Sequence, residues 1–147
     1  MASFNFLDYC NPCGAWCCKG EAPYASKEEL TLLNVKKIGQ RADGSCQFLK
    51  RNQCTEYQLR PLECRLFPFD IKEIEGALTW ILWLNCPANA VMEVDENLTR
   101  FEQDILVSWS IQYIKDYVAY HRINEPPKYA ELPFTKIRSV NFVKHKQ

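Results

Sequence analysis

Four of the eight cysteines in this chain lie within the nine-residue string CNPCGAWCC. The other four follow singly, and the complete set of candidate ligands is Cys10, Cys13, Cys17, Cys18, Cys46, Cys54, Cys64 and Cys86. Thiolates bind soft metal ions and iron-sulfur clusters far better than other side chains do. Ligands close together in sequence also lose little loop-closure entropy when they converge on one centre. The first hypothesis is therefore a metal or cluster site.

The spacing C-x2-C-x3-C-C favours an iron-sulfur cluster over zinc. A four-cysteine zinc ribbon usually provides a second close pair, which this sequence lacks. A [4Fe-4S] cluster takes four cysteines and tolerates a mixture of close and distant ones. We expect Cys10, Cys13 and Cys17 to bind it with one later cysteine. Cys17 and Cys18 would point to opposite sides of an extended backbone, so one of them is available to a second site.

The even number of cysteines also suits a secreted scaffold with four disulfides. Against this reading, the N-terminus MASFNFLDYCNPC has no basic start, apolar run or cleavage site of a signal peptide. The adjacent Cys17 and Cys18 can hardly bridge each other without strain. We therefore expect a cytoplasmic protein whose thiols stay reduced and bind metal. Any single dispersed cysteine can instead be an ordinary core residue.

The composition predicts one globular α+β domain. The chain has 147 residues, 47% of them apolar, which suffices for a hydrophobic core. Lys plus Arg and Asp plus Glu number 18 each, so no bulk field attracts nucleic acid or anionic lipid. The most apolar stretch, Ala77 to Leu84, is far shorter than the roughly 20 residues of a membrane-spanning helix. We expect neither a nucleic-acid nor a membrane partner.

The elements around the later cysteines are short. A capping box of Ser26 and Glu29 predicts a helix from about Lys27 to Ile38, which Gly39 would end. A turn at residues 43–44 should precede Cys46. A helical turn is expected over residues 55–59, and the Arg60-Pro61 pair should break it.

The second half of the chain has the sequence patterns of strands and of a long helix. Residues 69–84 predict a β-hairpin that turns near Glu75-Gly76, with a second strand that is apolar on both faces. Apolar residues then recur at helical spacing over about Glu96 to Arg122, which predicts one long helix near the C-terminus. The stripe consists of Leu98, Phe101, Ile105, Trp109, Tyr113 and Tyr117. We thus expect a metal-binding part over 1–90, a packing helix over 91–123 and an irregular or weakly extended tail over 124–147.

The strings CNPCGAWCC, GSCQFL and QCTEYQLRPLECRLFPF, in this order, resemble the YkgJ-type cysteine-cluster family. That family is described as chelating zinc or iron, and a similar cysteine set occurs in flagellin lysine methylases, for which an iron-sulfur cluster is the implied cofactor. The resemblance covers Cys10 to Phe69. It implies that the motif cysteines are Cys10, Cys13, Cys17, Cys18, Cys46, Cys54 and Cys64. The chain has CPANA at Cys86 where the family pattern leads us to expect CPG, which sets Cys86 apart.

The same resemblance makes Tyr57, Arg60, Pro61 and Arg65 the characteristic neighbours of the motif cysteines. If the two arginines face inward, they can offset the negative charge of a thiolate site; otherwise they form surface ion pairs. Pro61 is expected to set a rigid turn that presents Cys64.

Aromatic and histidine side chains add little to the ligand set. Trp16 is either a shield for the site or an ordinary core aromatic. His121 and His145 are expected in solvent, and the tyrosines of the long helix in the core.

The expected function is binding of an iron-sulfur cluster with a redox or accessory role, for example beside a methyl-transferring enzyme. A zinc-stabilised module that recruits a protein partner is the alternative. An enzyme with a cysteine nucleophile is a third reading, but no histidine lies near a cysteine in sequence. No glycine-rich nucleotide or S-adenosylmethionine loop is identified, so we do not expect a self-contained methyltransferase. Whether the protein is an enzyme of another kind stays open.

Overall fold

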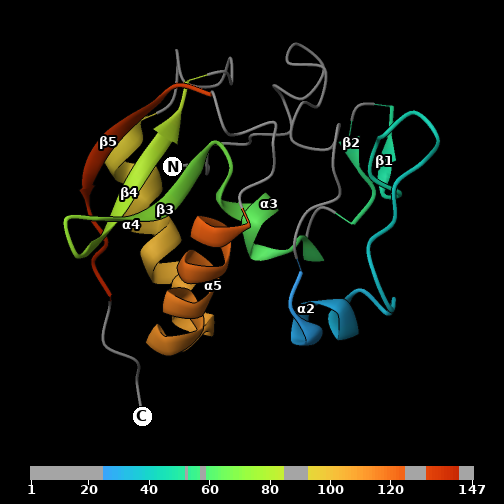
Figure 1. Cartoon of the computed structure of the whole chain (residues 1–147), viewed down its shortest axis with the longest axis horizontal. Coiled ribbons are helices and arrows are strands. Elements are labelled where there is room, and N and C mark those ends of the chain that lie inside the picture. Colours follow the sequence, from blue (N-terminus) through green and yellow to red (C-terminus); the bar gives the residue numbers. More distant parts are fainter. Residues whose placement is uncertain (1–24, 52, 57–58, 85–92, 125–131, 143–147) are drawn as a thin grey trace. The chain divides into compact units, whose positions relative to one another are not determined.

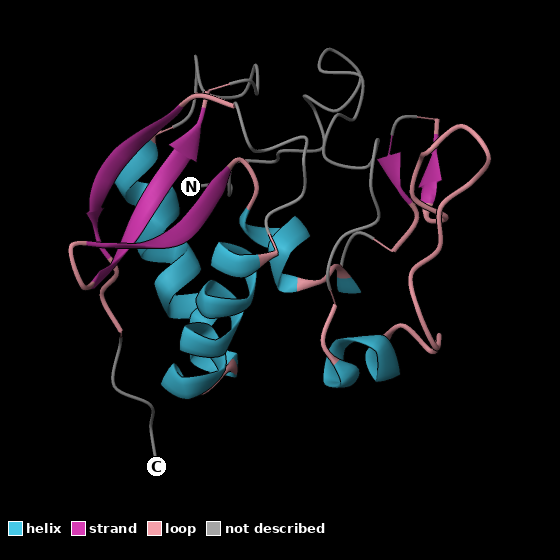
Figure 2. Cartoon of the chain, in the orientation of Figure 1, coloured by secondary structure: helices cyan, strands magenta, loops and turns pink. Residues whose placement is uncertain are grey.

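The computed structural model describes residues 25–51, 53–56, 59–84, 93–124 and 132–142 (Figure 1). The chain forms two compact units, Met1–Phe67 with Cys86–Ala88, and Pro68–Asn85 with Asn89–Gln147. Helices and strands occur in both units, as Figure 2 shows, which confirms the predicted α+β class. The finer prediction of a single domain stays a prediction.

The first described element of the first unit is helix α2, Lys27–Leu32, which starts where the capping box predicts. Ser26 Oγ accepts a hydrogen bond from the Glu29 backbone N–H at 3.2 Å, and Glu29 Oε1 accepts one from the Ser26 N–H at 3.1 Å. These bonds satisfy two of the N–H groups that a helix start leaves without an intrahelical partner.

Helix α2 ends well before Gly39, so the predicted end near Ile38 is wrong. Asn34 adopts the left-handed conformation, with φ of 56°. Its N–H donates to the carbonyl of Thr31, and the N–H of Val35 donates to the carbonyl of Leu30, both at 3.1 Å. This pair of bonds is a Schellman motif, and Asn is one of the few residues besides Gly that accept its left-handed position.

A turn and a two-stranded ribbon follow α2. Gly44 has φ of 85°, which confirms the predicted turn before Cys46. Strands β1, Leu49–Lys50, and β2, Gln53–Cys54, pair antiparallel with Leu49 opposite Cys54. At residues 55–59 the described part of the expected helical turn is one bond, from the Leu59 N–H to the Glu56 carbonyl at 2.9 Å.

The last described element of the first unit is helix α3, Leu62–Leu66, with Pro61 as its N-cap residue. The break at Arg60-Pro61 was expected, but the helix that begins after it was not. Leu62 and Leu66 are fully buried. A five-residue helix has little stability of its own, so burial of these two side chains holds it.

The second unit contains the predicted β-hairpin. Strands β3, Phe69–Ile74, and β4, Ala77–Trp83, pair along their whole length. Glu75 and Gly76 form the two-residue turn with φ of 53° and 82°. Two positive φ values match the twist of the flanking strands, which makes this turn geometry favourable in hairpins.

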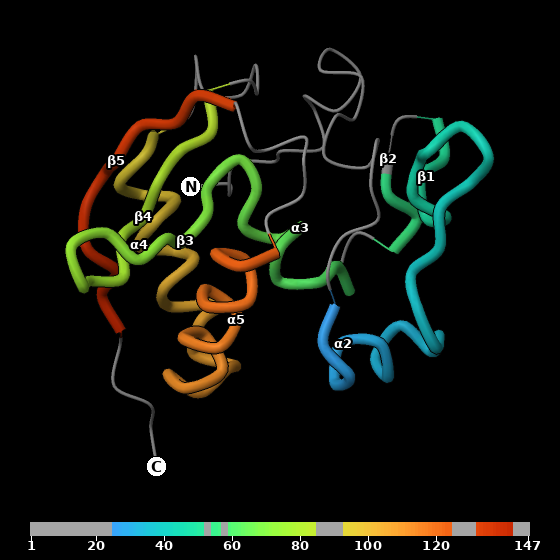
Figure 3. Tube along the Cα trace, viewed as in Figure 1, coloured from blue at the N-terminus to red at the C-terminus, as the bar shows by residue number. Residues whose placement is uncertain are grey.

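A third strand, β5, Phe134–Ser139, pairs antiparallel with β4 and gives the sheet order β3-β4-β5. Figure 3 follows the chain to this strand, which lies beside β4 although helices intervene in sequence. The tail was expected to be irregular or weakly extended, and no alternating apolar pattern marks it as a strand. Pairing with the central strand supplies the backbone bonds that hold it.

The single long helix expected over residues 96–122 is wrong. The structure contains α4, Val94–Asp104, a 3₁₀ turn η5, Leu106–Ser108, and the longest helix α5, Ile111–Ile123, which β5 follows. Trp109 is extended, and Ser110 Oγ accepts a hydrogen bond from the Tyr113 N–H at 3.0 Å. The serine thus starts a new helix in the middle of the apolar stripe. Among the described helices, none is long and apolar enough to cross a bilayer.

Helix α4 packs on the sheet through aromatic contacts and one buried acid. The Phe101 ring lies 5.7 Å from that of Phe69 and 6.2 Å from that of Trp80. The Glu102 carboxylate accepts hydrogen bonds from Trp80 Nε1 at 2.9 Å and from both terminal nitrogens of Arg138 on β5. This acid therefore links α4 to two strands.

Helix α5 contributes polar links to strand β3, among them an exposed ion pair from Arg122 Nη1 to Glu73 Oε2 at 3.4 Å. The Tyr117 hydroxyl donates to Asp70 Oδ1 at 3.1 Å, and the Tyr117 side chain is buried as expected. Tyr120 is 41% exposed, contrary to the expectation that the tyrosines lie in the core.

Candidate metal centre

Three of the eight candidate ligands lie among the described residues: Cys46, Cys54 and Cys64. All three belong to the first unit. Five candidate ligands, together with Trp16, Tyr57 and His145, lie outside the described residues: Cys10, Cys13, Cys17, Cys18 and Cys86. The structure therefore gives the positions of three of the four dispersed cysteines.

Cys46 is buried at the end of the turn and carries a free thiol. It bridges antiparallel to Gln40, and its carbonyl accepts a hydrogen bond from the Leu49 N–H at 3.0 Å. The loop on either side is closed by Gly39 and Gln47, which exchange a backbone bond of 3.0 Å and a side-chain bond of 2.6 Å. Backbone pairing thus fixes where this cysteine lies.

The turn that leads to Cys46 is built around Asp43. Its Oδ1 accepts hydrogen bonds from the Ser45 hydroxyl at 2.6 Å and from the Ser45 N–H at 3.0 Å. These two bonds, the hydroxyl bond first, hold the pKa of Asp43 below its ordinary value, because they favour the ionised carboxylate. The turn is an Asx turn, which Asp followed by Gly favours.

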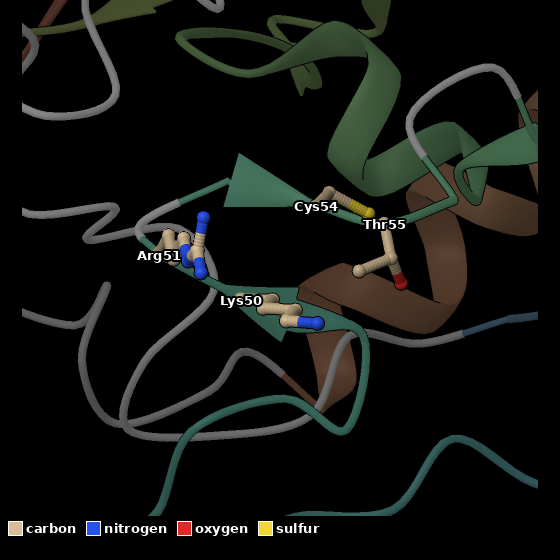
Figure 4. Close-up of a pocket in the computed structure, with 4 residues that line it drawn as sticks. All are labelled: Lys50, Arg51, Cys54 and Thr55. Atoms are coloured by element: carbon tan, nitrogen blue, oxygen red, sulfur yellow. The ribbon is translucent and has the colours of Figure 1, made fainter.

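Cys54 lies on β2 opposite Leu49 and is half-buried. Its side chain borders a pocket of about 330 Å³ that Lys50, Arg51 and Thr55 also line (Figure 4). These three neighbours were not predicted from the sequence. The signal for two of them was the basic pair Lys50-Arg51, at the end of β1 and in the turn that follows.

Cys64 is the third residue of α3 and is half-buried. Arg60 Nη1 donates to the Cys64 carbonyl at 3.1 Å, so this arginine lies beside the helix that carries the cysteine. Burial lowers the pKa of Arg65, and the charge of Arg60 lowers it further, while Glu29 opposes both. The guanidinium groups of Arg60 and Arg65 are therefore close enough to repel each other, and Arg60 contacts the backbone of Cys64.

Glu29 ties the two helices of the first unit together. Its side chain is only 4% exposed, and its Oε2 accepts a hydrogen bond from the backbone N–H of Leu62, the first residue of α3. The other carboxylate oxygen caps α2 through Ser26. The capping box identified the second contact, but nothing in the sequence identified the first.

Within the described ranges, no group of three or more His, Cys, Asp or Glu side chains is arranged to hold a metal ion. His121 lies in the second unit, with Nδ1 2.9 Å from the Tyr117 carbonyl oxygen, and is half-buried rather than in solvent.

A small α+β protein with eight thiols, seven of them placed before residue 65, defines the class as a cysteine-rich chelating protein. The chain belongs to the CxxCxxCC family, described as "Putative zinc- or iron-chelating domain", whose model matches residues 9–85. This match confirms the resemblance drawn from the three cysteine strings. Seven cysteines lie inside the matched segment, and Cys86 lies one residue beyond it. No curated protein and no solved structure matches the chain significantly.

Proposed function

We propose that this protein binds a [4Fe-4S] cluster through Cys10, Cys13, Cys17 and Cys64. The observation that carries the proposal is the zinc- or iron-chelating family, whose match contains all four residues. The four ligands are all cysteine thiols, which bind both zinc and the iron of an iron-sulfur cluster. One close set and one remote cysteine is the ligand arrangement that iron-sulfur clusters accept more readily than zinc ribbons do.

The charges near Cys64 support an anionic centre. Four thiolates around a cluster core of charge two plus leave a net charge of about minus two. Arg60 and Arg65 would offset that charge, and a thiolate-rich centre would stabilise the protonated form of the half-buried Arg65.

Cys64 is favoured as the remote ligand because its helix is well anchored. Leu62 and Leu66 are fully buried, and Glu29 accepts a hydrogen bond from the first N–H of the helix. A rigid ligand loses little entropy on binding, so an anchored helix is a suitable support for it. Cys46 and Cys54 are the next candidates.

The role of the cluster is redox, or accessory to another protein that carries out the chemistry. A cytoplasmic location would keep the unliganded thiols reduced. The alternative is a structural zinc ion that stabilises a module for recruiting a protein partner, since the family description names zinc as well as iron.

The two proposals differ in colour and stoichiometry. We expect protein purified without oxygen to be brown, with about four iron and four acid-labile sulfide per chain, as a cubane cluster requires. Iron, zinc and sulfide are measured on the same preparation. Colourless protein that carries one zinc and no sulfide would contradict the cluster and support the alternative.

A further inference from the structure

The described part of the first unit contains a pocket beside Cys54. The pocket lies between β1 and β2, has a volume of about 330 Å³ and is lined by Lys50, Arg51, Cys54 and Thr55. Figure 4 shows Lys50 on one strand and Cys54 on the other, with Thr55 just after Cys54 and Arg51 just after Lys50. This volume is at the lower end of the range for small-molecule sites, about 300 Å³ and upward.

Backbone pairing holds the pocket walls in place. Lys50 pairs with Gln53, and the neighbouring Leu49 pairs with Cys54. The Thr55 N–H donates to the carbonyl of Phe48 at 2.7 Å, which extends the ribbon by one bond beyond β2. The lining residues therefore come from a short antiparallel ribbon whose register is set by its own hydrogen bonds.

The pocket is cationic. Lys50 and Arg51 are exposed, and over the described ranges neither side chain forms an ion pair or a hydrogen bond. Two adjacent positive charges attract an anion. A guanidinium presents paired N–H donors to an oxyanion, an ammonium adds a compact charge, and the Thr55 hydroxyl adds a donor.

We propose that this pocket binds a small phosphate-type oxyanion, either inorganic phosphate or the phosphate group of a small ester. The donors are nitrogen and hydroxyl groups, and two of them carry a positive charge. Of the proposed cluster ligands, Cys64 lies in the described part of the chain, and it does not line this pocket.

The test is a titration of the full-length protein with inorganic phosphate at constant ionic strength, by calorimetry and by amide NMR shifts of residues 48–56. We expect saturable binding, with the largest shifts in this segment. A parallel titration with glycerol phosphate shows whether an ester binds as well as the free ion. Equal shifts with sodium chloride would mean simple charge screening and would overturn the proposal, as would the absence of saturable binding.

The variant Lys50→Gln/Arg51→Gln removes both charges. We expect it to weaken phosphate binding about tenfold or more, a factor that corresponds to about 1.4 kcal/mol. The matched control is Lys72→Gln/Arg122→Gln, which removes the same net charge from the second unit. Equal weakening in both variants would overturn the assignment, because it would trace binding to net charge alone. Metal content measured on each variant separates a lost phosphate site from a lost cluster.

Discussion

The carboxylate of Glu29 accepts a hydrogen bond from the backbone N–H of Leu62, 33 residues further along the chain. The same side chain caps its own helix through Ser26. One buried acid thus fixes the start of α2 and the start of α3, the helix that carries Cys64. The support of the candidate ligand therefore depends on a residue far from the cysteines in sequence.

We predict that Glu29→Ala destabilises the first unit by about 2 kcal/mol or more, since a buried donor left unsatisfied costs about 1 to 3 kcal/mol. Urea unfolding of the variant measures the change. Glu28→Ala, at an exposed position in the same helical turn, is the control and should change stability little. Equal effects of the two substitutions would show that the Leu62 contact contributes nothing.

A second prediction concerns the metal content of cysteine variants. Cys13→Ala and Cys64→Ala should each remove most of the iron and sulfide, because a four-ligand cluster loses one of its thiolates. Cys86→Ala, outside the family match, should keep the full metal content. Retention of the full cluster by the Cys13 variant would refute the ligand set, and retention by the Cys64 variant alone would point to Cys46 or Cys54.

Glu102 makes the second unit sensitive to acid. Burial alone would raise the pKa of its carboxyl, but hydrogen bonds from Arg138, the Asn141 N–H and Trp80 together hold it below the ordinary value of 4.5. A depressed folded-state pKa contributes stability that is present above about 4.5 and is lost as the pH falls through the lower folded value.

We therefore expect Glu102→Gln to destabilise the protein at pH 7 by about 3 kcal/mol, the cost of breaking a buried pair. The difference from the wild type should be smaller at an acidic pH below the depressed pKa of the native carboxyl, where that carboxyl carries a proton. Urea unfolding followed by tryptophan fluorescence at both pH values measures it. Glu96→Gln, an exposed position on the same helix, is the control. A difference that stays constant with pH would disprove the role of the carboxylate charge.

Ser110 separates η5 from α5, and its removal tests that break. Ser110→Ala should cost about 1 kcal/mol, the usual effect of losing an N-cap side chain. Ser108→Ala, two residues earlier and exposed, lacks a capping bond and should be neutral. Thermal unfolding compares the two, and a neutral Ser110 variant would speak for one continuous helix instead.

Local chemistry explains which elements were predictable. The capping box at Ser26 and Glu29 and the hairpin turn at Glu75-Gly76 each depend on residues within four positions of one another, so their geometry is readable from a short string. The left-handed Asn34 that follows α2 also obeys a local rule for helix ends. Gly39, five residues later, was nevertheless the stronger helix-ending signal in the sequence.

Other features depend on distant parts of the chain. β5 is a strand because β4 offers it a partner, and its own sequence, FTKIRS, has only weak alternation. The pocket beside Cys54 exists because a ribbon brings Lys50 and Thr55 together across a turn. Propensity and periodicity describe single segments, so neither identifies such pairings.

By itself, the sequence determined the chemistry available to this protein: thiols in one dense string, the zinc- or iron-chelating family they define, and the local signals that start a helix and turn a hairpin. Only the tertiary structure decided that Glu29 supports the helix of Cys64, that Glu102 joins a helix to two strands, and that two cations border a pocket at Cys54. The physical reason is separation along the chain. Residue types specify what a side chain can bind, whereas folding decides which groups far apart in sequence come within hydrogen-bonding distance.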